Sequence, residues 1–204
     1  MKIEYIVLDE NLKMRDLAGY EKLLPNDRQE KIARYRFEKD QLRSLIAGLL
    51  IRRAIGDSEI IFGAHEKPYA KDSGICFSVS HSGDIVAIAV DENEVGLDVE
   101  EIPEENRLKI ADRFYHPAER AYVHGAQDKA RAFCRIWTRK EAVLKMTGEG
   151  ISTDLTAFDT TAEPLSGQIV TVDLDNYCLS VCSEKAISSM DVYISKIELK
   201  ELLQ

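Results

Sequence analysis

The sequence predicts an α+β protein of two similar αβ lobes related by pseudo-twofold symmetry. Each half of the 204-residue chain carries one long periodic helix that ends in a glycine and precedes alternating strands. The tetrapeptide CFSV at 76–79 also returns as CLSV at 178–181, 102 residues later, which is half the chain. A repeat of this kind indicates that one supersecondary unit is present twice.

The first half is expected to hold one long helix between strands. From Asp40 onward, apolar residues recur at i, i+3, i+4, i+7 and i+8, and Gly56 stands where a glycine ends many helices. Period-two alternation, or an apolar run bounded by turn residues, predicts strands on either side of this helix. These strands are expected at 2–8, 75–80 and 85–90.

The second half is expected to follow the same plan. Alternation predicts a strand at 95–100, and Pro117 stands in the first turn of a short helix over 118–123. A second long helix over 129–146 is closed by Gly148. The later strands are expected at 168–174, 177–182 and 192–199.

Composition and charge exclude several classes of protein. With 27 Lys and Arg against 36 Asp and Glu, the net charge of −9 disfavours a nucleic-acid binder, which needs a cationic surface. No apolar run approaches the length of about 20 residues that a membrane span requires, and no signal peptide is expected. The four cysteines lack paired C-x-x-C spacing, which favours core thiols in a reducing cytoplasm over zinc or disulfides.

Two acidic residues on one predicted strand form a candidate metal site. Asp98 and Glu100 are two residues apart, so both side chains project from one face while Val95, Leu97 and Val99 point to the other. Two carboxylates on a rigid element suit Mg²⁺, which completes its shell with water and substrate phosphates. The alternative is a solvated strand face next to a run of further glutamates.

A second candidate lies on the long helix of the second half. Trp137, Glu141 and Lys145 are spaced i, i+4, i+8 and share one stripe, so an acid, a base and the single tryptophan lie together. The alternative is an ordinary exposed Glu–Lys pair, worth about 0.2–0.5 kcal/mol.

The predicted strand end at Ser80 and His81 and a basic segment suit phosphate binding. The SHSG sequence at 80–83 brings hydroxyl, imidazole and glycine-turn donors together. Adjacent residues on a strand point to opposite faces, so a Ser–His nucleophile and a hydrolase are disfavoured.

Eight basic residues stand against three acidic ones between Arg28 and Arg53, and Lys67 adds another cation. Together with a metal site and a Glu–Lys helix, these features predict a phosphoryl-type transfer.

The chain resembles a known family. VGLDVE at 95–100 followed by WTRKEAVLK at 137–145 is similar to the paired signature of the phosphopantetheinyl transferases. KP at 67–68 and FSVSHSG at 77–83 resemble the surfactin-synthetase-activating branch of that superfamily, which is monomeric and two-lobed. The resemblance implies that superfamily's fold. It implies an N-terminal lobe over 1–95 that binds coenzyme A phosphates and a C-terminal lobe over 96–204 with Mg²⁺ and the catalytic helix.

The resemblance also implies an activity, a location and residue roles. Such enzymes are cytoplasmic and move the 4′-phosphopantetheine arm of coenzyme A onto a serine of an apo acyl or peptidyl carrier protein, releasing adenosine 3′,5′-bisphosphate. Asp98, Glu100 and Glu141 would bind Mg²⁺, and Glu141 would also accept the serine proton, directly or through water. Lys145 would stabilise or protonate the leaving phosphate. The coenzyme A contacts it implies are Arg28, Lys31, Arg43, Ser44, Lys67, Ser80, His81, Lys140 and Lys145.

Two alternatives remain open from the sequence. The first is a module that binds coenzyme A or a carrier protein but has lost catalysis, and the presence of Asp98, Glu100, Glu141 and Lys145 disfavours it. The second is a Mg²⁺-dependent phosphotransferase that acts on another nucleotide.

Overall fold

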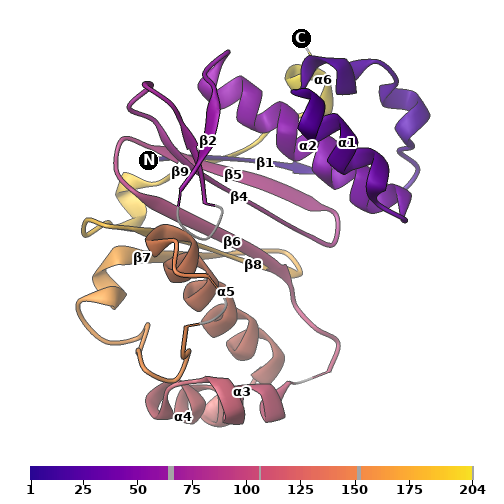
Figure 1. Ribbon diagram of the computed structural model, residues 1–204. Helices are drawn as coiled ribbons and strands as arrows, with labels where there is room; N and C mark the ends of the chain where they lie inside the picture. Colours follow the sequence, from indigo (N-terminus) through magenta and orange to yellow (C-terminus); the bar gives the residue numbers. More distant parts are fainter. Residues whose placement is uncertain (64–66, 106, 151–152, 204) are drawn as a thin grey trace.

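The computed structural model describes residues 1–63, 67–105, 107–150 and 153–203, which form two sheets packed face to face between two long helices. One sheet has the order β4-β5-β1-β9 and the other β6-β8-β7. Between them lies a core that includes Ile3, Ala87, Leu97 and Leu179. Helix α2 covers the outer face of the first sheet and α5 that of the second (Figure 1).

The helices and strands that the sequence predicts fall near their expected positions, and the structure also contains shorter ones at 26–34, 60–62, 68–70, 108–114 and 199–202 that were not predicted. The first half contains β1 (Lys2–Val7), α1 (Asn26–Arg34), α2 (Glu38–Ile55), β2 (Ile60–Phe62), β3 (Pro68–Ala70), β4 (Cys76–Ser82) and β5 (Ile85–Asp91). The second contains β6 (Val95–Glu101), α3 (Leu108–Phe114), α4 (Pro117–Gly125), α5 (Lys129–Thr147), β7 (Ile169–Leu174), β8 (Tyr177–Ser183), β9 (Tyr193–Lys196) and α6 (Leu199–Leu202). As predicted, α2 and α5 end at glycines with positive φ, Gly56 at 63° and Gly148 at 72°.

The topology of the first half is repeated in the second, as the sequence predicts. The offset between equivalent elements, however, differs from the 102 residues that separate the two tetrapeptides. The strand orders β4-β5-β1 and β7-β8-β6 correspond, with α2 and α5 as the matching helices. The first residues of β1, α2, β4 and β5 precede those of β6, α5, β7 and β8 by 93, 91, 93 and 92 positions. The two copies of the tetrapeptide are 102 residues apart and therefore lie in β4 and β8, which are not equivalent strands. The α+β class is confirmed, and the tetrapeptide is not the trace of the repeat.

The C-terminal segment returns to the first sheet. β9 pairs in parallel with β1, from Lys2 opposite Tyr193 to Tyr5 opposite Lys196, and α6 packs on the core under α2. β9 thereby covers the edge of β1, whose backbone groups would otherwise lack strand partners on that side. The expected lobes over 1–95 and 96–204 differ from the structure at this end, because β9 and α6 belong to the second half of the chain but complete the first lobe.

Three of the four cysteines lie in the core, as the sequence predicts. All four cysteines are free, and Cys134, Cys178 and Cys182 are buried. In the part of the chain that the structure describes, no helix has the length and apolar character needed to cross a bilayer.

A Cβ on Gly96 would overlap the carbonyl oxygen of Ala142 and the backbone nitrogen of Met146. Glycine at this position therefore lets α5 lie directly on β6.

Candidate active site

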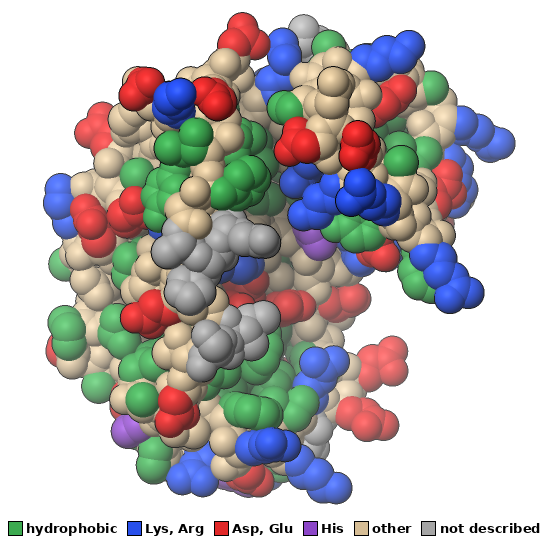
Figure 2. All heavy atoms as spheres, viewed as in Figure 1, with side chains coloured by type: hydrophobic (Ala, Val, Ile, Leu, Met, Phe, Trp, Pro, Cys, Tyr) green, Lys and Arg blue, Asp and Glu red, His purple; other side chains and the backbone are tan. Residues whose placement is uncertain are grey.

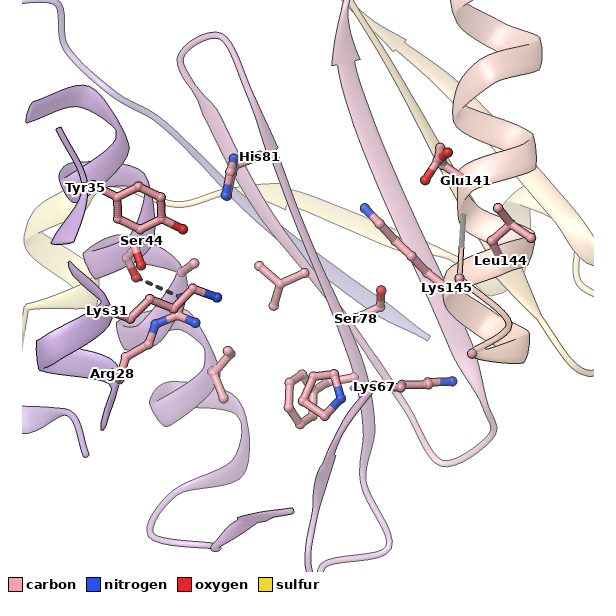
Figure 3. Close-up of a pocket in the computed structure, with 17 residues that line it drawn as sticks. Arg28, Lys31, Tyr35, Ser44, Lys67, Ser78, His81, Glu141, Leu144 and Lys145 are labelled. Atoms are coloured by element: carbon pink, nitrogen blue, oxygen red, sulfur yellow. Dashed lines mark hydrogen bonds between the residues drawn. The ribbon is translucent and has the colours of Figure 1, made fainter. Parts of the chain in front are cut away.

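A cleft of about 410 Å³ lies between α1 and α2 on one side and α5 on the other. Arg28, Lys31 and Ser44 line the first wall, and Glu141 and Lys145 line the second, as Figure 3 shows. Strand β4 runs between the walls and contributes His81. Figure 2 shows Lys and Arg side chains gathered over α1 and α2 beside this hollow. The cleft therefore has one cationic wall and one wall that carries the predicted acid and base.

Asp98 is the centre of a buried polar cluster. The strand β6 directs Asp98 and Glu100 towards α5, as alternation predicts, while Leu97 packs between the sheets. Asp98 is 3% exposed, and its Oδ1 accepts hydrogen bonds from Ser80 Oγ at 2.8 Å and from Lys145 Nζ at 2.7 Å. Lys145 Nζ also donates to Ser80 Oγ at 3.0 Å. Lys145 thus connects α5 to both β4 and β6.

Three serines connect β4 to β6 beside this cluster. Ser78, Ser80 and Ser82 alternate along β4, so their side chains point to one face. The N–H of Leu97 donates to Ser78 Oγ at 2.9 Å, and Ser82 Oγ donates to Glu100 Oε2 at 2.6 Å. Ser78 and Ser82 were not among the predicted site residues, although the same alternation that predicts the strand places them with Ser80.

The carboxylates lie close enough to affect one another. Burial raises the pKa of Glu141, and the nearby charge of Asp98 raises it further. Burial also raises the pKa of Glu100, partly offset by the hydrogen bond from Ser82. A cation placed among these groups would relieve both the burial cost and the mutual repulsion.

The residues fit a Mg²⁺ ion in their chemistry. Asp98 Oδ2 is buried and has no hydrogen-bond partner among the described residues, so one hard oxygen remains available beside two further carboxylates. Within the same described ranges, no three His, Cys, Asp or Glu side chains are grouped closely enough to hold an ion together. In this arrangement Lys145 supplies the positive charge next to Asp98.

Most of the predicted phosphate-binding residues reach the cleft. Arg28 Nη2 donates to the carbonyl of Ser44 at 3.0 Å. Arg28 Nε and Ser44 Oγ are buried without a partner in the described part of the chain, and both residues line the cleft. His81 is exposed at the cleft, where partial desolvation and the charge of Arg43 lower its pKa, and Lys31 is exposed at the rim.

Two further predicted residues lie just behind the cleft lining. Ser80 is buried and turned towards Asp98. The guanidinium of Arg43 is directed at the carbonyl of Gly83, with a Nε–O distance of 2.9 Å, and pairs with Asp40 at 2.9 Å. Arg43 therefore holds the turn that follows His81.

Two predicted phosphate ligands are directed elsewhere. Lys140 is completely buried, and its Nζ pairs with Glu119 Oε2 at 2.7 Å, away from the cleft. Adjacent helical residues lie about 100° apart, so Lys140 and Glu141 cannot face the same way. Lys67 borders the cleft, but its Nζ pairs with Glu94 Oε2 at 2.5 Å. This arrangement differs from the expectation that the ammonium groups of Lys140 and Lys67 contact coenzyme A.

The cleft also contains residues that sequence reasoning missed. Tyr35 lines it from the segment between α1 and α2, and Ile51, Phe77 and Leu144 form an apolar part of the lining. Tyr35 lies between Arg34 and Arg36 in the sequence, but its uncharged side chain does not belong to the basic pattern that marks this segment.

Family models match nearly the whole chain. Residues 94–195 match the model described as 4′-phosphopantetheinyl transferase superfamily, and residues 13–93 match the model of a 4′-phosphopantetheinyl transferase N-terminal region. The chain belongs to the 4′-phosphopantetheinyl transferase superfamily. Both matched regions of this chain contribute to the cleft, the first with Arg28 and His81 and the second with Glu141 and with Lys145, which bonds to Asp98.

Named relatives support the same family. The chain is 35% identical to 4′-phosphopantetheinyl transferase AcpT of Salmonella typhi, over 69% of this chain and 76% of that protein. It is 31% identical to 4′-phosphopantetheinyl transferase Sfp of Bacillus subtilis strain 168, over 78% and 75%. It is 33% identical to 4′-phosphopantetheinyl transferase gsp of Aneurinibacillus migulanus, over 65% of this chain and 59% of that protein, so it spans less than two thirds of that relative.

Proposed function

We propose that this transferase moves the 4′-phosphopantetheine arm of coenzyme A onto a serine hydroxyl of an apo acyl or peptidyl carrier protein. The observation that carries the proposal is the placement of a cationic wall, with Arg28 and Lys31, across one cleft from Glu141 and Lys145, with His81 on the strand between them. Coenzyme A brings a pyrophosphate and a 3′-phosphate, for which guanidinium and imidazole donors are suitable partners. Its apolar portions can lie against Ile51 and Phe77.

Asp98, Glu100 and Glu141 are the proposed ligands of Mg²⁺. When bound, the ion would neutralise charge on the pyrophosphate during transfer. The unpartnered Oδ2 of Asp98 and the raised pKa values of Glu100 and Glu141 support this assignment within the described residues.

Glu141 and Lys145 have complementary roles in the proposed reaction. Glu141 accepts the proton of the serine hydroxyl, directly or through one water. The serine oxygen then bonds to the phosphorus that bears the pantetheine arm, and the bond from that phosphorus to the bridging oxygen breaks. Lys145 neutralises or protonates the departing phosphate of adenosine 3′,5′-bisphosphate. Lys145 lies one helical turn from Glu141, which supports this division of roles between the two residues.

The function is tested by incubating the chain with coenzyme A, Mg²⁺ and a panel of apo carrier proteins, read by mass spectrometry. The panel contains carriers of fatty acid, polyketide, peptide and aminoadipate pathways. We expect at least one carrier to gain one phosphopantetheine arm. Binding of coenzyme A without transfer to any carrier would instead support the non-catalytic module. Transfer from another nucleotide alone would support the alternative phosphotransferase.

Asp98→Asn is expected to reduce Mg²⁺ affinity by at least about 100-fold. Changes to residues that merely support metal ligands already cost about 10–100-fold, and Asp98 is itself a proposed ligand. The measurement is a Mg²⁺ titration followed by fluorescence of Trp137, which lies on the helix of Glu141. Asp175→Asn, in an exposed turn, is the matched control. Unchanged Mg²⁺ dependence of transfer in Asp98→Asn would contradict the metal assignment.

His81→Ala is expected to weaken the binding of coenzyme A by about 10–150-fold, in line with about 1.5–3 kcal/mol for a hydrogen bond to a charged group. If His81 contacts the 3′-phosphate, the loss for 3′-dephospho-coenzyme A will be smaller. Calorimetry on both ligands measures this difference, with His124→Ala on α4 as the control. Equal losses for both ligands would place His81 on the pyrophosphate instead.

The proposal also includes a cytoplasmic location and a monomeric state. Four free thiols are compatible with a reducing compartment. Light scattering on the purified chain tests the monomer, and a dimeric mass would contradict it.

A further inference from the structure

Lys67 joins three separate parts of the structure. Its side chain is only 8% exposed, and its Nζ lies 2.5 Å from Glu94 Oε2 and 2.6 Å from the carbonyl oxygen of Met146. Nζ also lies over the ring of Tyr69, 5.4 Å from its centre. Figure 3 shows the amino group of Lys67 directed away from Arg28.

The bond to Met146 lies at the end of the catalytic helix. The last four carbonyls of a helix lack partners within it, and a cation near the C-terminus interacts favourably with the helix dipole. Met146 is in the last turn of α5, directly after Lys145. Lys67 therefore satisfies a free carbonyl at the point where the helix places Lys145 next to Asp98.

The bond to Glu94 links this helix end to β6. Glu94 comes directly before β6, and the glycine at position 96 is where α5 rests on that strand. Moving Lys67 onto a phosphate would leave Glu94 and the carbonyl of Met146 without this cation. The ion pair also cancels the charge of Lys67, so cationic recognition is left to the opposite wall, with Arg28 and Lys31.

We infer that Lys67 is a positioning residue for phosphopantetheine transfer, and not a ligand of a coenzyme A phosphate. It fixes the C-terminal turn of α5, and with it Lys145, against β6. This inference rests on the proposed function, because the step that Lys145 serves is part of that function.

The test compares Lys67→Met, which keeps an unbranched side chain but removes the charge, with Glu94→Gln and the double variant. Lys71→Met is the matched control, because Lys71 pairs with Glu59 at 2.9 Å, is half-exposed and follows the same hairpin. Transfer is measured with coenzyme A and with 3′-dephospho-coenzyme A, per mole of folded enzyme. Lys67→Arg, which can still pair with Glu94, is included as the conservative variant.

We expect kcat to fall about 10-fold in Lys67→Met and in Glu94→Gln, since a displacement of 1 Å in a catalytic group can cost up to about 100-fold. The double variant should be no worse than either single variant, because both remove one interaction. The KM for coenzyme A should change less than about 2-fold, and the preference for coenzyme A over its dephospho form should not change. Lys67→Arg should recover part of the rate, and Lys71→Met should behave as the unmodified chain.

Three results would overturn the inference. A rise in KM for coenzyme A alone, without an effect of Glu94→Gln, would make Lys67 a phosphate ligand. Unchanged kcat in both single variants would remove the positioning role. Lower thermal stability with full activity per folded molecule would leave Lys67 a purely structural residue.

Hydrogen exchange separates this inference from the proposed function. Amides in the last turn of α5, around Met146, should exchange faster in Lys67→Met and Glu94→Gln but not in Lys71→Met. This measurement needs no transfer activity. If the unmodified chain transfers no phosphopantetheine arm, the proposed function is wrong. If the exchange rates do not change in the variants, the positioning role of Lys67 is wrong, whatever the transfer activity.

Discussion

Glu141→Gln is expected to lower kcat by about 10²–10⁴-fold, the usual contribution of a positioned general base. The amide has the shape of the carboxylate but cannot accept the serine proton. Before a cation is bound, burial and the charge of Asp98 raise the pKa of Glu141. Single-turnover transfer with saturating coenzyme A and carrier measures the effect.

The same variant distinguishes the base from the metal ligand. Glu101→Gln is the matched control, since Glu101 is an exposed neighbour on β6. If Glu141 acts mainly as the base, the Mg²⁺ affinity and coenzyme A affinity of Glu141→Gln will fall much less than its rate. A parallel loss of Mg²⁺ affinity would make the ligand role dominant. Transfer at the unmodified rate would contradict both roles and favour a non-catalytic helix.

Local periodicity predicts the arrangement of the acidic residues well. Asp98 and Glu100 had to share a strand face, and Glu141 and Lys145 had to share a helix stripe, because both patterns depend only on backbone geometry. The structure has both features, and the Asp98–Lys145 distance of 2.7 Å shows that the two elements meet there. The glycine at 96 is the local reason why they can approach.

The direction of each basic side chain could not be predicted from a count of charges. Arg43 and Lys67 are each bonded to groups that are distant in sequence, the carbonyl of Gly83 and the carboxylate of Glu94. Such partners become visible only when the chain is folded. The pairing of β9 with β1 is likewise non-local, and the expected boundary of the second lobe had no local signal for it.

Lys140→Met is expected to destabilise the fold by about 3–5 kcal/mol, because removal of one partner leaves the other charge buried. Lys140 Nζ donates to the carbonyls of Leu155 and Phe158 at 2.7 and 2.8 Å, in addition to its bond with Glu119. Glu119 is itself 0% exposed and accepts hydrogen bonds from the backbone N–H and the hydroxyl of Thr160. Urea unfolding measures the loss, with Lys109→Met at an exposed position of α3 as the control.

The double variant with Glu119→Gln shows whether the buried charge is the cause. If it is, Lys140→Met with Glu119→Gln will be more stable than the sum of the two single changes predicts, because no unpaired carboxylate remains. Coenzyme A affinity of the folded fraction should stay within about 2-fold of the unmodified chain, since Lys140 is directed away from the cleft. A selective loss of coenzyme A affinity at nearly full stability would contradict this account, and would return Lys140 to the phosphate-binding role that the family resemblance implies.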